Sequence, residues 1–147
     1  MTSRFTLAVH SLALLTLADE QEAGPVTSEA IAESAATNPV VVKRTLAALG
    51  RAGLVGARGG RGGGSWLARP ATSISLREVY EALEDDETLI PLHPGGLSSS
   101  CQVGQGVASY LDDLYDDLAD ALKARLGNTT LADVARGVCA RVGAQAH

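Results

Sequence analysis

Residues 38–51 read NPVVVKRTLAALGR, and residues 52–68 continue as AGLVGARGGRGGGSWLA. Asn38 is a good helix-capping residue, and Pro39 suits the first position of a helix, where its missing N–H is not needed. Gly53 suits a helix end because it adopts the left-handed conformation without steric cost. The first segment therefore predicts one helix that ends just before Gly53.

A β-hairpin is expected directly after this helix. Leu54–Ala57 and Ser65–Ala68 have the composition of two short strands, and Arg58–Gly64 holds five glycines and two arginines between them. Glycine permits the positive φ angles that tight turns require. The order of elements is therefore a helix followed by a hairpin.

A second helix is expected before the first one. Thr27 and Ser28 are both suitable N-caps for a short helix through Ala35, which would point Ile31 and Ala32 inward. Two short helices separated by a tight break and followed by a hairpin form a winged helix-turn-helix. A largely buried helix over 4–18 completes this unit, and the predicted fold class is mainly α with a small β-hairpin wing.

The helix at 39–51 has two different faces. Apolar side chains recur at the spacing that places them toward the protein interior. The opposite face carries two arginines, and a helix face of this kind fits the major groove of DNA. Lys43 and Arg44 are predicted to contact guanine, Val40 a thymine methyl group, and Arg51 a phosphate. Ser28 and Asn38, at the starts of the two helices, complete the predicted DNA contacts of this unit. An ordinary solvated helix face is the alternative.

The glycine-rich hairpin turn is predicted to enter the minor groove. Arg58 and Arg61 would follow the negative potential there, and Gly59, Gly62 and Gly63 would allow close backbone approach. A nucleotide-binding loop is the rival interpretation, but a strand rather than a helix follows, and no Gly-Lys-Ser/Thr ending is present. A plain flexible hairpin is the simplest alternative.

Charge is distributed unevenly along the chain. The net charge is −5, which by itself disfavours nucleic acid as a partner. However, residues 34–77 contain seven basic residues and no acid, whereas residues 78–122 contain eleven acids and no lysine or arginine. A local basic field can bind phosphate whatever the total charge, so duplex DNA stays the expected partner.

The C-terminal half predicts three further helices. Ser75 caps a helix over Leu76–Leu83, residues 84–104 are irregular, and a long helix covers about 107–126. Thr130 begins a last helix that ends near Val142. An apolar stripe of the kind that pairs two helices follows one face of the long helix. Its predicted dimerisation residues are Val107, Leu111, Leu114, Leu118 and Leu122.

Three regions follow from this pattern. Residues 1–83 form the winged helix-turn-helix, residues 84–106 a flexible sensor-type loop, and residues 107–147 the dimerisation helix with the C-terminal helix. Aspartates occupy the other face of the long helix and would repel DNA, so this face is expected to point away from it.

The chain resembles the Rrf-type family of bacterial winged-helix transcription regulators. Five stretches carry the resemblance, and together they span most of the chain: RFTLAVHSLALL (4–15), IAESAATNPVVVKR (31–44), AGLV (52–55), the glycine-rich wing, and ISLREVYEAL (74–83). The resemblance implies a homodimer in which the long helix crosses its partner and the N-terminal helix joins the interface.

The resemblance also raises the question of a cofactor. Family members that bind an iron–sulfur cluster use three cysteines in the loop before the long helix, whereas this chain has only Cys101 there. A [2Fe–2S] cluster normally needs four protein ligands. We therefore expect no cofactor and no metal site, and the chain resembles the cluster-free branch. Cys101 remains a candidate redox thiol, or an incidental one, and Cys139 is expected to be a buried, small apolar residue.

Other functions and locations have less support. The two cysteines form no disulfide framework, so a reduced, cytoplasmic location is expected. The apolar run at 5–18 resembles a signal peptide, but His10 interrupts it, and it is too short to span a membrane. His10 itself is expected to be a hydrogen-bonded interface residue. No catalytic motif is present, so the protein is not expected to be an enzyme.

The sequence thus predicts a regulator that binds a double-stranded DNA operator as a homodimer, most simply as a repressor. An oxidant or a small molecule would be its signal. The alternative is a winged-helix module that contacts other proteins and binds no DNA. The acid-free tract at 34–77 favours DNA, because a module that contacts only proteins needs no such tract.

Overall fold

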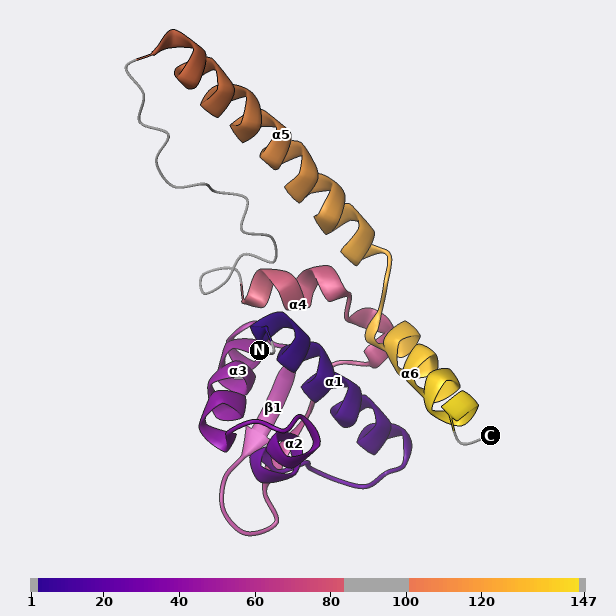
Figure 1. Ribbon diagram of the computed structural model, residues 1–147. Coiled ribbons are helices and arrows are strands. Elements are labelled where there is room, and N and C mark those ends of the chain that lie inside the picture. Colours follow the sequence, from indigo (N-terminus) through magenta and orange to yellow (C-terminus); the bar gives the residue numbers. More distant parts are fainter. Residues whose placement is uncertain (1–2, 84–100, 146–147) are drawn as a thin grey trace.

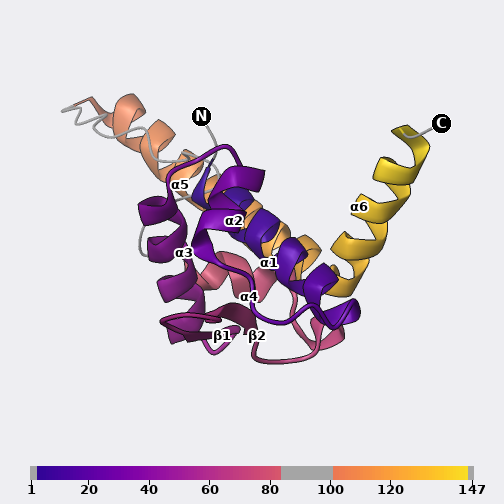
Figure 2. The same ribbon diagram turned by 90° about the horizontal axis from the view of Figure 1, so that it is seen from below.

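The computed structural model describes residues 3–83 and 101–145. A helical body carries a two-stranded hairpin at one end, and a long helix projects from the body (Figure 1). Figure 2 shows the long helix α5 and the last helix α6 leaving the body in different directions. The predicted fold class, mainly helical with a small hairpin, is confirmed.

The N-terminal helix α1 (Arg4–Glu20) is the central element of the body. Ser3 caps it by accepting a hydrogen bond from the Thr6 amide at 3.1 Å. Leu12 and Leu15 are fully buried, and the two hydroxyl side chains on the same buried face donate to carbonyls one turn earlier within the helix. The predicted buried helix over 4–18 therefore exists and extends two residues further.

The helix-turn-helix consists of α2 (Ser28–Ser34) and α3 (Pro39–Arg51). Thr27 caps α2, accepting from the Ala30 amide at 3.1 Å, and Asn38 caps α3 as predicted. The two helices pack on each other, and both contribute to one hydrophobic core.

The wing is an antiparallel hairpin of β1 (Val55–Arg58) and β2 (Gly64–Leu67). Both strands lie within one residue of their predicted positions. Strand β2 also packs against α1, which fixes the hairpin to the body. A 3-10 turn, η1 (Ala71–Ser73), leads from the wing into the next helix.

The C-terminal half contains α4 (Leu76–Ala82), α5 (Gln102–Gly127) and α6 (Leu131–Gln145). Helix α5 begins about five residues earlier than predicted. The Gly/Ser-rich composition up to Gly104 predicts an irregular segment there, but Gly104 and Gly106 both lie within the first turns of α5. Residues 102–106 are therefore helical, while residues 84–100 of the predicted sensor-type loop lie outside the described residues.

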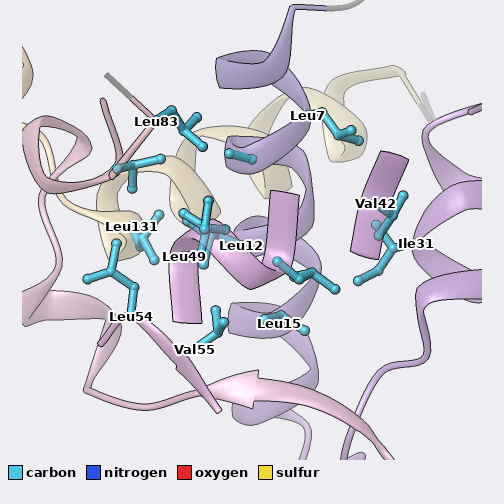
Figure 3. Packing of buried hydrophobic residues seen from close by; sticks show 14 of the residues in the cluster. Leu7, Leu12, Leu15, Ile31, Val42, Leu49, Leu54, Val55, Leu83 and Leu131 are labelled. Carbon is cyan, nitrogen blue, oxygen red and sulfur yellow. The ribbon is translucent and has the colours of Figure 1, made fainter. Parts of the chain in front are cut away.

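One core joins all of these elements except α5. Figure 3 shows Leu12 of α1, Leu49 of α3 and Leu131 of α6 meeting in it. All three side chains are fully buried. Because α6 contributes Leu131 to the same core as the helix-turn-helix, α6 is fixed to the helix-turn-helix.

Candidate nucleic-acid interface

Helix α3 is held rigidly at both ends. Asn38 accepts a hydrogen bond from the Val40 amide at 2.8 Å at its start. At its end, Gly53 has a φ of 76°, its amide donates to the Gly50 carbonyl at 3.0 Å, and the Leu54 amide reaches back to Leu49 at 3.0 Å. These two bonds form a Schellman motif, which satisfies carbonyls that the helix leaves unpaired.

The two faces of α3 divide as predicted. The buried side consists of Val42, Thr45, Leu46, Ala48 and Leu49. Arg44, Ala47 and Arg51 are exposed on the opposite side, and Val40 is 60% exposed. Within residues 3–83 and 101–145, neither arginine has a hydrogen-bond or ion-pair partner. This stripe is therefore available to an anionic partner.

Lys43 lies at the side of this stripe, toward α2. Its Nζ lies 3.8 Å from Oε1 of Glu29, and both side chains are more than 60% exposed. Ser28, another predicted DNA contact, is the first residue of α2 and is partly exposed. The predicted contacts from α2 and α3 thus lie close together, with one acidic side chain among them.

The wing turn has a defined hydrogen bond and two left-handed glycines. The Arg58 guanidinium donates to the Gly62 carbonyl at 3.1 Å, across the turn. Gly60 and Gly62 have φ near +80°, which favours glycine. Arg61 is exposed at the tip and has no partner in the described part of the chain. Arg61 is therefore the arginine at the tip, while Arg58 also braces the turn.

Two glycines of the wing differ in role. Gly63 is buried, and a Cβ on it would lie 2.1 Å from the Arg58 carbonyl oxygen. Gly59 is exposed, with open space where a Cβ would be. Gly63 was predicted to permit close approach to DNA. Its backbone instead packs against the end of β1, so Gly63 determines the shape of the turn.

Sequence reasoning missed the third segment of the wing. Val26 forms a bridge with Ser65: each amide donates to the other's carbonyl, at 2.9 and 2.8 Å. A Cβ on Gly64 would lie 2.7 Å from the Val26 carbonyl oxygen. One valine after a proline is too short to show strand periodicity, so the sequence carries no signal for this pairing. The bridge ties the wing to the start of α2.

Helix α5 buries no residue against the described part of the chain. Of the predicted dimerisation residues, Val107, Leu114 and Leu118 are between 42% and 44% exposed. Leu111 and Leu122 are half-buried. The predicted apolar stripe is thus present, and it faces solvent in the single chain.

An apolar groove of about 500 Å³ runs between α1 and α6. Val9, Leu14 and Val138 are among its lining residues, and His10 lies in its wall. Nε2 of His10 and Oγ of Ser34 in α2 are 2.8 Å apart, within hydrogen-bonding distance. His10 is therefore hydrogen-bonded as predicted, and it links the groove to the helix-turn-helix.

The two cysteines lie far apart. Cys101 is the N-cap residue of α5, and Cys139 lies in α6, beyond the other end of α5 (Figure 1). Both are exposed. The prediction that Cys139 is buried is wrong, because α6 packs on the body through Leu131 and Ala135, nearer its start. Among the described residues, no three His, Cys, Asp or Glu side chains gather as a metal site.

The geometry combines a helix-turn-helix whose second helix presents an arginine stripe with a basic hairpin beside it. These features define the class of winged-helix DNA-binding proteins. The family model of Rrf2, described as an iron-dependent transcriptional regulator, matches residues 1–137, and the chain therefore belongs to the Rrf2 family. The family is one of transcription regulators and not of enzymes. The resemblance inferred from the sequence is thereby confirmed.

Individual relatives support this assignment. YwnA of Bacillus subtilis, named as an HTH-type transcriptional regulator, is 36% identical over 134 residues, covering 91% of this chain and 96% of YwnA. The transcriptional regulator IscR of Escherichia coli is 31% identical over 134 residues, covering 91% and 78%. A crystal structure of a DNA-binding protein superimposes with a TM-score of 0.69 at 32% identity, covering 90% of this chain and 98% of that one. The protein is accordingly a DNA-binding transcription regulator. No helix within residues 3–83 and 101–145 is long and apolar enough to cross a membrane.

Proposed function

We propose that the protein is a homodimeric, sequence-specific repressor that binds a near-palindromic operator. Two α3 helices would lie in successive major grooves, about one helical turn apart. The observation that carries this proposal is the exposed face of α3, where Arg44 and Arg51 have no partner in the described part of the chain.

The proposed contacts divide by chemistry. Arg44 and Lys43 donate to guanine O6 and N7, and Val40 meets a thymine methyl group. Arg51, Ser28 and Asn38 contact phosphates, which position the protein but carry no sequence information. In the wing, Arg61 enters the minor groove, and Arg58 with Gly62 and Gly63 maintains the turn that presents it.

The proposed homodimer rests on two apolar surfaces. The stripe on α5 lies on a helix about 39 Å long, since an α-helix rises about 1.5 Å per residue. The groove between α1 and α6 is also apolar. Surfaces of this kind are unfavourable in water. We propose that the α5 helices of two copies cross and that each copy's groove receives part of its partner.

The proposed regulator uses no iron–sulfur cluster. The chain has two cysteines, and they lie toward opposite ends of α5, so one chain cannot bring both to the same cluster. An oxidant or a small molecule would then be the signal, and Cys101 is the candidate thiol, since it is exposed at the start of the proposed dimer helix. Iron analysis of protein purified without oxygen tests this: stoichiometric iron would contradict it.

Fluorescence anisotropy tests the proposed function. The full chain is titrated into a duplex from its gene's own upstream region and into a scrambled duplex, at two salt concentrations. Preferential binding to the first duplex that weakens steeply with salt is expected, because Lys and Arg contacts to phosphate release counterions. Binding that ignores salt, or equal affinity for both duplexes, would contradict the proposal and favour a protein partner. The titration is repeated after oxidation. If the wild type then loses DNA binding and Cys101→Ser keeps it, the Cys101 thiol is the sensor.

A further inference from the structure

Glu29 is an acidic side chain on a surface that is otherwise basic. It lies in the first turn of α2, next to Ser28, and its Oε1 is 3.8 Å from Nζ of Lys43 in α3. No acid occurs between residues 34 and 77, and Glu29 lies outside this tract but reaches Lys43 within it. An acid near phosphates opposes DNA binding unless it has a specific role.

The pair contributes little to folding. Both side chains are more than 60% exposed, and exposed ion pairs add little to the stability of a protein. The first helix of a helix-turn-helix crosses the DNA backbone, while the second enters the major groove. A pair that joins these two helices therefore lies between the phosphates and the base edges.

We infer that Glu29 is a specificity-determining residue that acts through Lys43. The lysine ammonium group has three donors. The Glu29 carboxylate attracts this group across 3.8 Å, which is an ion-pair distance and too long for a hydrogen bond. Lys43 is therefore held back from the nearest phosphate and keeps its donors for acceptors in the groove. Duplexes that lack the correct base then lose a phosphate contact, whereas the correct duplex retains its base contact.

This inference rests on the proposed DNA contacts of Lys43, and the two can fail separately. The test compares wild type and Glu29→Gln on two duplexes: the one that the wild type enriches from a random-sequence pool, and a scrambled version. Glu33→Gln on the same helix is the matched control, because Glu33 is exposed and has no ion pair in the described part of the chain.

We expect Glu29→Gln to bind the scrambled duplex about three- to tenfold more tightly and the enriched duplex with nearly unchanged affinity. For the scrambled duplex, the slope of log affinity against log salt steepens by about 0.9, the change for one added phosphate contact. Glu33→Gln should do neither, and thermal unfolding of both variants should match wild type.

A second background separates action through Lys43 from direct repulsion of phosphate. In Lys43→Gln, the further change Glu29→Gln should have no effect on either duplex, because coupled residues are non-additive. An equal effect in both backgrounds would overturn the inference, as would an unchanged ratio of the two affinities. If the wild type enriches no duplex at all, the proposed function fails as well; if it does enrich one and Glu29→Gln leaves the ratio unchanged, only this inference fails.

Discussion

Ala36 adopts a backbone conformation that alanine disfavours. It lies in the turn between α2 and α3 with a φ of 52°. The turn is closed by two hydrogen bonds, from the Ala36 amide to Glu33 at 3.3 Å and from the Thr37 amide to Ala32 at 2.9 Å. For a residue with a Cβ, the left-handed conformation costs about 1–2 kcal/mol. The angle between the two helices is thus maintained against local strain.

Replacing Ala36 with glycine should stabilise the protein. Glycine removes the strain from the folded state, but it also makes the unfolded chain more flexible, which opposes folding. The free energy of unfolding should therefore rise by a net of about 0.5–1 kcal/mol. For a chain of this size the melting temperature should rise by about 1–4 °C. Differential scanning calorimetry measures this. Ala35→Gly is the control, since Ala35 has an ordinary φ of −90° and glycine should destabilise there; a lower melting temperature for Ala36→Gly would be inconsistent with the strain.

Arg44→Ala should reduce sequence discrimination. If the arginine donates to guanine O6 and N7, its loss costs about 1–3 kcal/mol at one base pair and little elsewhere. Arg51→Ala is the comparison, because a phosphate contact weakens binding to all sequences alike. Affinities for a set of single-base-pair variants of the operator distinguish the two. Uniform weakening by Arg44→Ala would show that it reads no base.

At the scale of elements, the wing depends on one buried glycine. In Gly63→Ala the new methyl group would lie 2.1 Å from a backbone carbonyl, so the turn must open and Arg61 must move. We expect affinity for the operator to fall roughly tenfold, about 1.4 kcal/mol. Gly59→Ala should bind as wild type, since its Cβ would meet open space. Fluorescence anisotropy compares them, and equal affinities would mean that the turn geometry does not matter for binding.

Capping boxes with acidic side chains begin both α4 and α6, and the pKa of each of these carboxyl groups is lowered. Arg69, and then the Ser75 amide, holds the pKa of Glu78 below its ordinary value of 4.5. The Thr130 amide likewise lowers the pKa of Asp133. Between these caps, the Leu76 amide donates to Thr129 and the Leu131 amide to Ile74, both at 2.9 Å.

A carboxyl pKa that is lower in the folded state than in the unfolded state determines how stability changes with pH. The stabilisation is complete above the unfolded value and is lost as the pH falls through the folded value. Stability should therefore decline below about pH 5, and Glu78→Gln with Asp133→Asn should flatten this decline. Urea unfolding at a series of pH values measures it. An unchanged slope in the double variant would mean that other carboxylates cause the acid sensitivity.

Elements were predictable where their signals are local. Asn38, Pro39 and Gly53 determine the ends of α3 by their own backbone chemistry, so its limits follow from the sequence. Ala36 has no such preference, and its conformation results from the packing of α2 on α3. The Val26–Ser65 bridge and the helical Gly104 and Gly106 depend on contacts or on helix propagation from neighbouring turns, and no local pattern reports them.

At the scale of the whole molecule, the exposed apolar surfaces follow from the arrangement of α5 and α6. Helix α6 packs on α1 and leaves the groove beside it. Helix α5 projects away from the body (Figure 1), and its apolar stripe is exposed. The stripe was predictable from helical spacing. The groove was not, because it forms between helices that are more than 100 residues apart in the sequence.

Leu118→Asp should therefore convert the proposed dimer into a monomer. Leu118 belongs to the apolar stripe and is 43% exposed in the single chain. In a dimer the new carboxylate would be buried without a partner, which is strongly unfavourable. The fold should survive, because α5 adds no residue to the core. Sedimentation equilibrium gives the mass, and circular dichroism checks the helix content.

The control is Asp116→Lys, which changes charge on the face opposite the stripe and should leave the mass unchanged.

The DNA affinity of the monomeric variant tests whether dimerisation is needed for operator binding. Two tethered recognition helices bind at high effective concentration, so the monomeric variant should lose at least about a hundredfold in affinity for a full operator. Its affinity for an isolated half-site should stay that of wild type. A Leu118→Asp protein that stays dimeric would move the interface away from α5, and one that is monomeric yet binds the full operator normally would mean that each chain reads DNA alone.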